Sequence, residues 1–228
     1  MSILKSIYDK YDTIICLDTE TTGLDFKNDQ IIDLGVIEVK SVRDELYITD
    51  EINSLIKLVD PNAKLSEEIV KLTHITDLDL KTKGDDIETV KQLFLNLLSK
   101  PGKKLIATYN AQFDLCFLSY FLRGYKIDNC DFLDILTVYK DRAIYPHKLC
   151  NAIENYHLED KVKNSHRALD DTLACFEVLK KMSSDKDDII SYVNLFGYNP
   201  KYVPVKKIKG VTYKPQPYVD KITKALYE

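Results

Sequence analysis

Residues 13–23 read TIICLDTETTG, an apolar run that ends in two acidic residues, Asp18 and Glu20. A short continuous apolar run is typical of a buried strand, so we expect a strand over residues 13–18. Alternate side chains of a strand point to the same side, which places the two carboxylates next to each other. Like charges this close resist joint ionisation unless a cation lies between them. Taken alone, the same pair is more typical of a solvated strand end.

A second acidic position stands in a helix that is otherwise apolar. Residues 111–122 read AQFDLCFLSYFL, in which Asp114 is the single charged residue. A helix with apolar side chains around nearly its whole circumference is expected to be buried. A buried carboxylate must be paired, hydrogen-bonded or bound to a metal ion. An ion pair with Arg123 or Arg167 is the structural alternative to a metal site.

The third acidic segment, residues 165–171, reads SHRALDD and is expected to lead into a helix. If both were helical, His166 and Asp171 would stand about 140° apart around the helix and face different sides. His166 can reach the side of the carboxylate only from the loop that enters the helix. Asp170 and Asp171 suit the first turn, where the helix dipole favours negative charge. Helix-terminal acids beside a surface histidine are the alternative interpretation.

Together the three segments resemble the motifs of one enzyme family. DTETTG at 18–23, YNAQFD at 109–114 and HRALDD at 166–171 are similar, in order and spacing, to the three motifs of the DEDDh 3′→5′ exonuclease family. That family includes the proofreading (epsilon) subunits and exonuclease domains of bacterial replicative DNA polymerases. The resemblance covers residues 13–181, including the supporting segment QIIDLGV at 30–36.

The resemblance implies a catalytic site and its cofactors. By position in the motifs, the ligands of two divalent cations, Mg²⁺ or Mn²⁺, would be Asp18, Glu20, Asp114 and Asp171. His166 would be the general base, since a histidine can take the proton of an attacking water. Four carboxylates suit such hard, oxygen-binding ions and not zinc. Two ions about 4 Å apart can stabilise the attacking water and the leaving 3′-oxygen of an in-line displacement.

Further roles implied by the resemblance concern the substrate. The residues that would hold the terminal nucleotide and position the 3′ end are Thr21, Thr22, Leu24, Asn110 and Phe113. Ordinary packing and loop hydrogen bonding are the alternative for each of them. Asp170 is the nearest competitor of Asp171 for the fourth ligand position. The chain departs from the family at Tyr109, where many members have His, and at His74, where Gly is usual.

The order of the expected elements indicates an α/β fold with a mixed sheet. Strands are expected at 13–18, 30–40, within 53–59, at 104–109 and at 131–135. Helices are expected after Ser66 and at 86–99, 111–123, 135–142, 148–156, 166–182, 185–196 and 218–227. The family resemblance implies a ribonuclease H-like sheet flanked by helices. We predict an exonuclease domain over residues 1–196 and a basic C-terminal extension over 197–228 that is extended or hairpin-like before its helix.

Composition excludes several classes of protein. The chain has 228 residues, 45% of them hydrophobic and 30% charged, which is typical of a globular protein and not of a disordered or collagen-like one. Five cysteines without a CxxC pattern argue against a disulfide framework and a cysteine zinc site. No segment has the pattern of a signal peptide or a membrane span, so a cytoplasmic location is expected.

The net charge of −4 is unevenly distributed. Residues 197–228 contain seven Lys and two acidic residues, and five tyrosines are interleaved with the lysines. This extension suits a nucleic-acid surface, a docking segment for a polymerase, or a tail folded over the domain with solvated lysines. The acidic remainder is compatible with an active site that holds metal ions.

The predicted function is a metal-dependent 3′→5′ exonuclease that hydrolyses single strands or frayed 3′ ends of DNA to nucleoside 5′-monophosphates, in replication proofreading. A DNA polymerase subunit is the protein partner that the resemblance suggests. An RNA-trimming or stand-alone repair exonuclease of the same family is the alternative, because the motifs do not separate DNA from RNA. A non-catalytic module that docks on a polymerase remains a third hypothesis, against which the complete set of acidic and basic groups argues.

Overall fold

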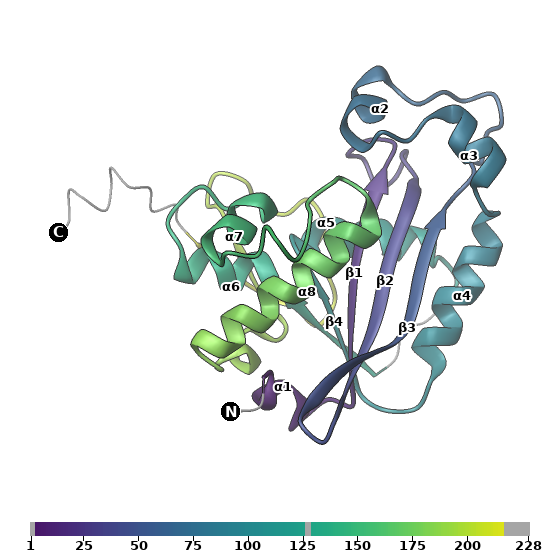
Figure 1. Ribbon diagram of the computed structural model, residues 1–228. Coiled ribbons are helices and arrows are strands. Elements are labelled where there is room, and N and C mark those ends of the chain that lie inside the picture. Colours follow the sequence, from purple (N-terminus) through teal and green to yellow (C-terminus); the bar gives the residue numbers. More distant parts are fainter. Residues whose placement is uncertain (1–2, 126–128, 217–228) are drawn as a thin grey trace.

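A five-stranded mixed sheet forms the centre of the computed structural model, which describes residues 3–125 and 129–216 (Figure 1). Its strands are β1 (Thr13–Thr21), β2 (Ile31–Val42), β3 (Glu45–Leu55), β4 (Lys104–Thr108) and β5 (Cys130–Asp134). They lie in the order β3-β2-β1-β4-β5. Strands β1, β2 and β3 pair antiparallel, whereas β4 pairs parallel with both β1 and β5. The α/β fold with a mixed sheet is therefore confirmed.

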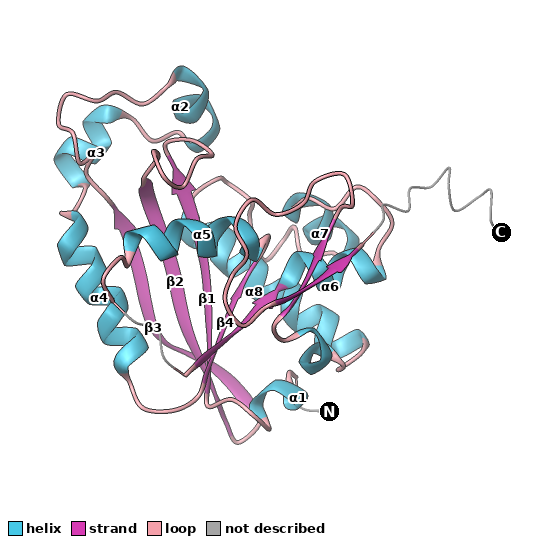
Figure 2. Cartoon of the chain, turned by 180° about the vertical axis from the view of Figure 1, so that it is seen from behind, coloured by secondary structure: helices cyan, strands magenta, loops and turns pink. Residues whose placement is uncertain are grey.

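Helices cover both faces of this sheet. They are α1 (Lys5–Tyr8), α2 (Glu67–Thr73), α3 (Asp77–Lys83), α4 (Ile87–Ser99), α5 (Ala111–Phe121), α6 (Ile135–Arg142), α7 (Leu149–Asn155) and α8 (Ala168–Asp185). Helix α8 crosses the face seen in Figure 1, and α5 crosses the opposite face, seen in Figure 2. Among the described residues, no helix is both long enough and apolar enough to span a membrane.

The alternation of side chains along β1 divides the core into two layers. Ile14 and Cys16 pack in one apolar cluster with residues of α7 and α8. Ile15 and Leu17 pack in a second cluster with residues of α4 and α5. All four side chains are fully buried, as expected for a central strand with helices on both faces. The same alternation decides to which face of the sheet each polar residue at the end of β1 points.

Most of the predicted elements are confirmed, with boundaries that differ by one to three residues. The Ser66 side chain accepts a hydrogen bond from the backbone N–H of Ile69 and so caps the start of α2. Helix α8 begins at Ala168, so His166 lies in the loop before it. Helix α3 was not expected from the sequence; it begins with a capping box in which Thr76 and Asp79 bond each other's backbone.

Two predicted elements are wrong. The third strand spans 45–55 and only its last three residues fall within the predicted 53–59, because β2 and β3 form a hairpin around Arg43 and Asp44, both at positive φ. Much of β3 is exposed edge strand, so its side chains lack the apolar signal of a core strand. The predicted helix over 185–196 is replaced by a 3₁₀ turn (Ile189–Tyr192) and the start of strand β6 (Leu195–Tyr198).

The C-terminal segment forms a second, two-stranded sheet. Strand β7 (Thr212–Pro215) pairs parallel with β6, so the extended segment is not a hairpin. Asn194 joins this unit to the main sheet, since its N–H donates to the carbonyl of Phe132 and its side-chain oxygen accepts from the N–H of Phe132. The division of the chain after residue 196 stays a prediction, and β6 runs across it. The helix predicted over 218–227 lies outside the described residues.

Candidate active site

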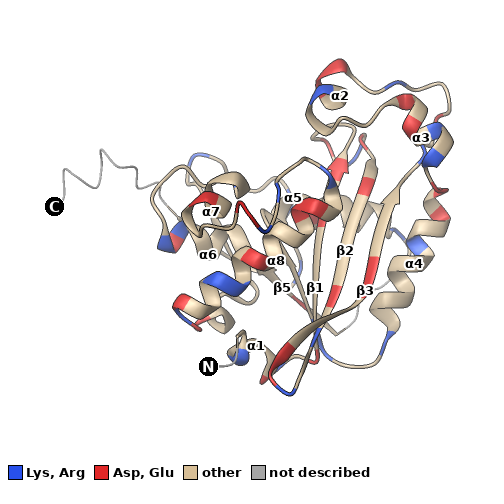
Figure 3. Cartoon of the chain, viewed as in Figure 1, with Lys and Arg blue, Asp and Glu red and all other residues tan. Residues whose placement is uncertain are grey.

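The end of β1 opens into a cleft of about 700 Å³ that lies between the sheet, the start of α5 and the loop before α8. Asp18 and Glu20 point to the same face of the sheet as Ile14 and Cys16, so their carboxylates face α8. Figure 3 shows acidic positions at the ends of β1 and β2 beside the first turn of α8. The predicted site residues that line the cleft are Asp18, Glu20, Asn110, His166 and Asp171.

Asp114 lies beneath the cleft and does not line it. Its side chain is only 2% exposed. Its two carboxylate oxygens accept hydrogen bonds from the hydroxyls of Thr19 (2.8 Å) and Thr108 (2.9 Å). Thr19 points to the opposite face of the sheet from Asp18 and therefore toward α5. Among the residues described, Asp114 forms no ion pair, so neither Arg123 nor Arg167 neutralises it.

Asp171 is held in place by the loop that precedes α8. The side-chain amide of Asn164 donates to its Oδ2 (2.7 Å), and the backbone N–H of Ser165 donates to its Oδ1 (3.1 Å). The side chain is 4% exposed and borders the cleft. Its neighbour Asp170 is exposed and accepts a hydrogen bond from the Ser165 hydroxyl outside the cleft. The structure therefore brings Asp171, and not Asp170, to the other carboxylates.

His166 reaches these carboxylates from outside the helix. Its backbone has φ 54°, a left-handed conformation that non-glycine residues seldom adopt. A ring nitrogen of His166 and one carboxylate oxygen each of Glu20 and Asp171 lie within 4.8 Å of one another. His166 is exposed, so its ring is accessible to water. This is the loop position that the spacing of His166 and Asp171 required.

Burial and mutual repulsion raise the pKa values of the clustered carboxyl groups. Burial, and then the charges of Asp114 and Asp171, hold the pKa of Asp18 well above its usual range. Burial and the charge of Asp171 raise the pKa of Glu20 to about 8. Burial raises the pKa of Asp114 to about 7, although the bonds from Thr19 and Thr108 act in the opposite direction.

The donor set fits divalent cations that prefer oxygen. Four carboxylates from three separate segments converge, and their pKa values are raised although Arg167 acts on Glu20 and His166 acts on Asp171 in the opposite direction. A cation among them would remove the repulsion that disfavours the charged forms. Hard ions such as Mg²⁺ and Mn²⁺ take ligands of this kind. Glu20 and Asp171 offer ligand atoms toward the open cleft, and His166 stands beside them.

Asp33 is a further acidic residue at the site that the sequence analysis missed. It pairs with Glu20 across β1 and β2 and is fully buried. Its Oδ2 accepts hydrogen bonds from the Arg167 guanidinium (2.8 Å) and from the N–H of Ala168 (3.2 Å). Asp33 thereby fixes the start of α8, directly after His166. A single charge within the apolar run IIDLGV was the available signal.

The predicted substrate residues are more dispersed. Thr21 and Thr22 use their hydroxyls within the loop, toward the carbonyl of Gly23 and the carboxylate of Asp29. Leu24 is 85% exposed. Asn110 borders the cleft with φ 70° at the start of α5. Phe113 packs against the ring of Phe117, with 4.9 Å between ring centroids, and does not line the cleft.

The histidine at position 74 keeps a backbone shape that suits glycine. His74 caps the end of α2 with φ 58°, in the left-handed region. Glycine is the usual residue at such a cap, because it has no Cβ to clash there. The departure from the family at His74 therefore leaves the loop backbone in the conformation that glycine would favour.

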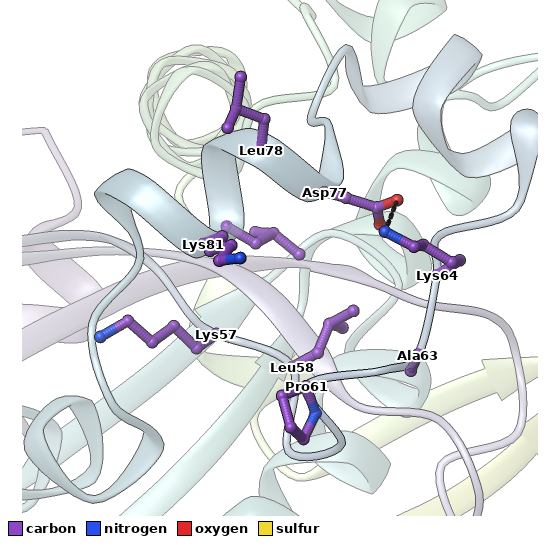
Figure 4. Close-up of a pocket in the computed structure, with 9 residues that line it drawn as sticks. Lys57, Leu58, Pro61, Ala63, Lys64, Asp77, Leu78 and Lys81 are labelled. Atoms are coloured by element: carbon purple, nitrogen blue, oxygen red, sulfur yellow. Dashed lines mark ion pairs between the residues drawn. The ribbon is translucent and has the colours of Figure 1, made fainter.

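A second hollow, of about 460 Å³, lies between the 57–64 segment and α3 (Figure 4). Its lining is largely apolar, and the ion pair between Lys64 and Asp77 (3.5 Å) closes one side. None of the predicted site residues lines it. The clustered carboxylates and His166 single out the cleft at the end of β1 as the candidate active site.

Known proteins similar to this chain include exonucleases and DNA polymerases. The family model described as "Exonuclease" matches residues 15–179. The chain is 30% identical over 207 residues to DNA polymerase III PolC-type of Clostridium perfringens, and 31% identical over 192 residues to that of Thermotoga maritima. These matches cover 86% and 76% of this chain but only 13% and 12% of the relatives. The chain thus spans about an eighth of the length of these curated relatives.

Solved structures share the fold at lower sequence identity. Exonuclease I of E. coli, in complex with a dT13 oligonucleotide, has a TM-score of 0.66 and 19% identity, covering 79% of this chain and 43% of that one. Cell-death related nuclease 4 (CRN-4) has a TM-score of 0.64 and 18% identity, covering 77% of this chain and 65% of that one. The ribonuclease H-like fold implied by the motifs is therefore confirmed.

Proposed function

This chain belongs to the exonuclease family, as a 3′→5′ exonuclease, and from that premise we propose that it hydrolyses single strands or frayed 3′ ends of DNA to nucleoside 5′-monophosphates. The observation that carries the proposal is the convergence of Asp18, Glu20, Asp171 and His166 at one cleft, with Asp114 buried beneath it. A site for structural purposes alone would not need several carboxylates that raise one another's pKa.

Each residue of the site has a proposed role. Asp18, Glu20, Asp114 and Asp171 would hold two divalent cations, Mg²⁺ or Mn²⁺. When bound, such ions stabilise negative charge that develops on the attacking and leaving oxygens. His166 would take a proton from the attacking water on a ring nitrogen, for which its exposed position beside Glu20 and Asp171 is suitable.

The substrate-binding roles rest on position around the cleft. Asn110 borders it, and Phe113 lies one turn further along the same helix, where it could contact the base of the 3′-terminal nucleotide. Leu24 is an exposed apolar side chain on the loop after β1, which suits contact with a nucleotide. Thr21 and Thr22 would shape that loop through their hydroxyl contacts.

A replication context is supported by the PolC-type relatives, and DNA as substrate by the oligonucleotide in the exonuclease I structure. We therefore favour proofreading, with a DNA polymerase subunit as partner, over RNA trimming. None of the five cysteines forms a disulfide, as is usual in the reducing cytoplasm, where we expect the protein to work.

Digestion of a 5′-labelled single-stranded DNA oligonucleotide tests the proposal. With Mg²⁺ or Mn²⁺ we expect a ladder that shortens from the 3′ end, and none with EDTA or in the Asp18→Ala variant. A matched RNA oligonucleotide in the same assay distinguishes the two substrates. Folded protein that leaves DNA intact with either metal, or an Asp18→Ala variant of near-normal activity, would refute the proposal.

A further inference from the structure

Residues 199–214, here called the basic segment, lie beyond the stretch that the exonuclease family model matches, residues 15–179. The basic segment contains five lysines and no acidic residue: Lys201, Lys206, Lys207, Lys209 and Lys214. The family model therefore assigns this segment no role. The contacts of the segment with α5 and its unbalanced positive charge indicate a role in binding the substrate.

The basic segment is fixed to the first turns of α5, the helix that begins at the cleft. The side-chain amide of Gln112 donates to the carbonyl of Lys206 (2.6 Å), and its oxygen accepts from the Tyr213 hydroxyl (2.7 Å). The same Tyr213 hydroxyl accepts from the N–H of Ile208 (2.8 Å). Gln112 stands between Asn110 and Phe113 in the first turn of α5, so the segment is anchored to the turn that carries two of the predicted substrate residues.

The segment also reaches the loop that follows β1. The Lys206 ammonium lies 5.5 Å from the ring centroid of Phe26 and 5.0 Å from that of Tyr120. Phe26 is two residues from Leu24, one of the predicted substrate residues. Lys206 therefore stands over aromatic rings at the side of the domain where we place the substrate.

The positive charge of the segment is not balanced by acidic neighbours. Within residues 3–125 and 129–216, none of its five lysines forms an ion pair, and four of them are exposed. Lys100, by contrast, is bonded to both Glu38 and Asp50. Apolar side chains are also exposed on the segment, with Tyr202 at 74% and Val205 at 91%. Lysines interleaved with accessible rings are the combination that binds single-stranded nucleic acid.

We propose that the basic segment is an accessory single-strand-binding surface that holds DNA nucleotides on the 5′ side of the one being removed. The inference rests on the proposed function and deepens it. The floor of the cleft carries the carboxylates of Asp18, Glu20 and Asp171, which repel phosphates, so lysines outside the cleft can add affinity for a longer strand. Lys207 and Lys209 supply charge for phosphates, and the Tyr202 ring supplies a face on which a base can stack.

The test compares two double variants that remove the same charge. Lys207→Gln/Lys209→Gln alters the basic segment. Lys10→Gln/Lys181→Gln removes two exposed lysines elsewhere, Lys10 before β1 and Lys181 on α8. Binding of a fluorescein-labelled 20-nucleotide oligo-dT is measured by anisotropy in EDTA over a series of salt concentrations. Hydrolysis of a 4-nucleotide and a 20-nucleotide substrate is measured separately with Mg²⁺.

For the Lys207→Gln/Lys209→Gln variant we expect about tenfold weaker binding of the 20-nucleotide strand at 0.1 M salt, and a salt slope smaller by about 1.4. The kcat on the 4-nucleotide substrate should not change, since neither lysine lines the cleft that holds the carboxylates. Lys207→Arg/Lys209→Arg should restore binding, and the Lys10→Gln/Lys181→Gln control should bind as the unaltered protein does.

Wild-type affinity for the 20-nucleotide strand in the Lys207→Gln/Lys209→Gln variant would overturn the inference, whether or not the segment binds a protein partner. An equal loss in the Lys10→Gln/Lys181→Gln control would overturn it as well, since the effect would then be one of net charge. Failure of the proposed function is distinguishable, because it would abolish hydrolysis of both substrates while leaving the anisotropy measurement intact.

Discussion

Single residues at the cleft are held by neighbours that no local sequence pattern identifies. The hydroxyls of Thr19 and Thr108 fix Asp114, and Asn164 fixes Asp171. Asp33 fixes the residues that follow His166 through Arg167 and the N–H of Ala168. These partners matter because a carboxylate must keep its orientation to hold a cation.

Replacement of His166 tests its role as general base. We expect His166→Ala to lower kcat by at least about 10²-fold, because the attacking water would lose its proton acceptor. Since the side chain is exposed, the melting temperature should change little. The limb of the pH–rate profile that depends on the general base should disappear. An unchanged profile, or a rate within a few-fold of normal, would contradict the role.

At the scale of elements, β2 and α8 meet at a point that admits no side chain. A Cβ atom on Gly35 would lie 2.3 Å from the backbone carbon of Ala168 and 2.4 Å from the N of Leu169. The Thr172 hydroxyl also donates to the carbonyl of Gly35 (3.0 Å). Gly35 pairs with Asp18 in the sheet, so this close approach brings the first turn of α8 to the carboxylates of β1.

Gly35→Ala should therefore move α8 away from the sheet. We expect a loss of about 1–3 kcal/mol in the free energy of unfolding, as is usual when a packed site is overfilled. The loss of exonuclease activity should exceed what this instability explains, because Asp171 and His166 move with α8. Thermal melting and activity measured well below the melting temperature separate the two effects. Normal stability with full activity would contradict this account of the packing.

Elements with a strong apolar pattern were predicted well, and those without one were not. The buried strands β1 and β4 and the helix α4 lie within a few residues of their predicted bounds. Strand β3 was misplaced because it is an edge strand with exposed polar positions. The segment 185–196 has helix-like composition, but two hydrogen bonds between Asn194 and Phe132 attach its end to the main sheet.

At the scale of the whole molecule, the clustered carboxylates couple folding to pH and to cations. The folded pKa values of Glu20 (about 8) and Asp114 (about 7) lie above those of an unfolded chain, so folding favours the protonated forms. Their contribution to stability is fully present below about pH 4 and is lost as pH rises through 7 to 8. The metal-free protein should therefore be destabilised by these groups in mildly alkaline solution.

Divalent cations should reverse that destabilisation. At 100-fold excess over the dissociation constant, Mg²⁺ or Mn²⁺ should stabilise the fold by about 2.7 kcal/mol, which is roughly 5–10 °C in melting temperature. The increase should be larger at pH 8 than at pH 6, because cations compete with protons for the carboxylates. Thermal melting with metal and with EDTA at both pH values measures it. An equal increase in the Asp18→Asn variant would contradict a site among these groups.

The sequence by itself determined the α/β class, most of the elements and the identity of the clustered residues, since apolar periodicity and three motifs in order are local properties of the chain. Only the tertiary structure decided that Asp171 and not Asp170 faces the cleft, that Asp33 belongs to the site, and that the basic segment lies along α5. These outcomes depend on contacts between residues up to about a hundred and thirty positions apart. Such contacts form when sheet pairing and helix packing bring distant segments together, which no local pattern encodes.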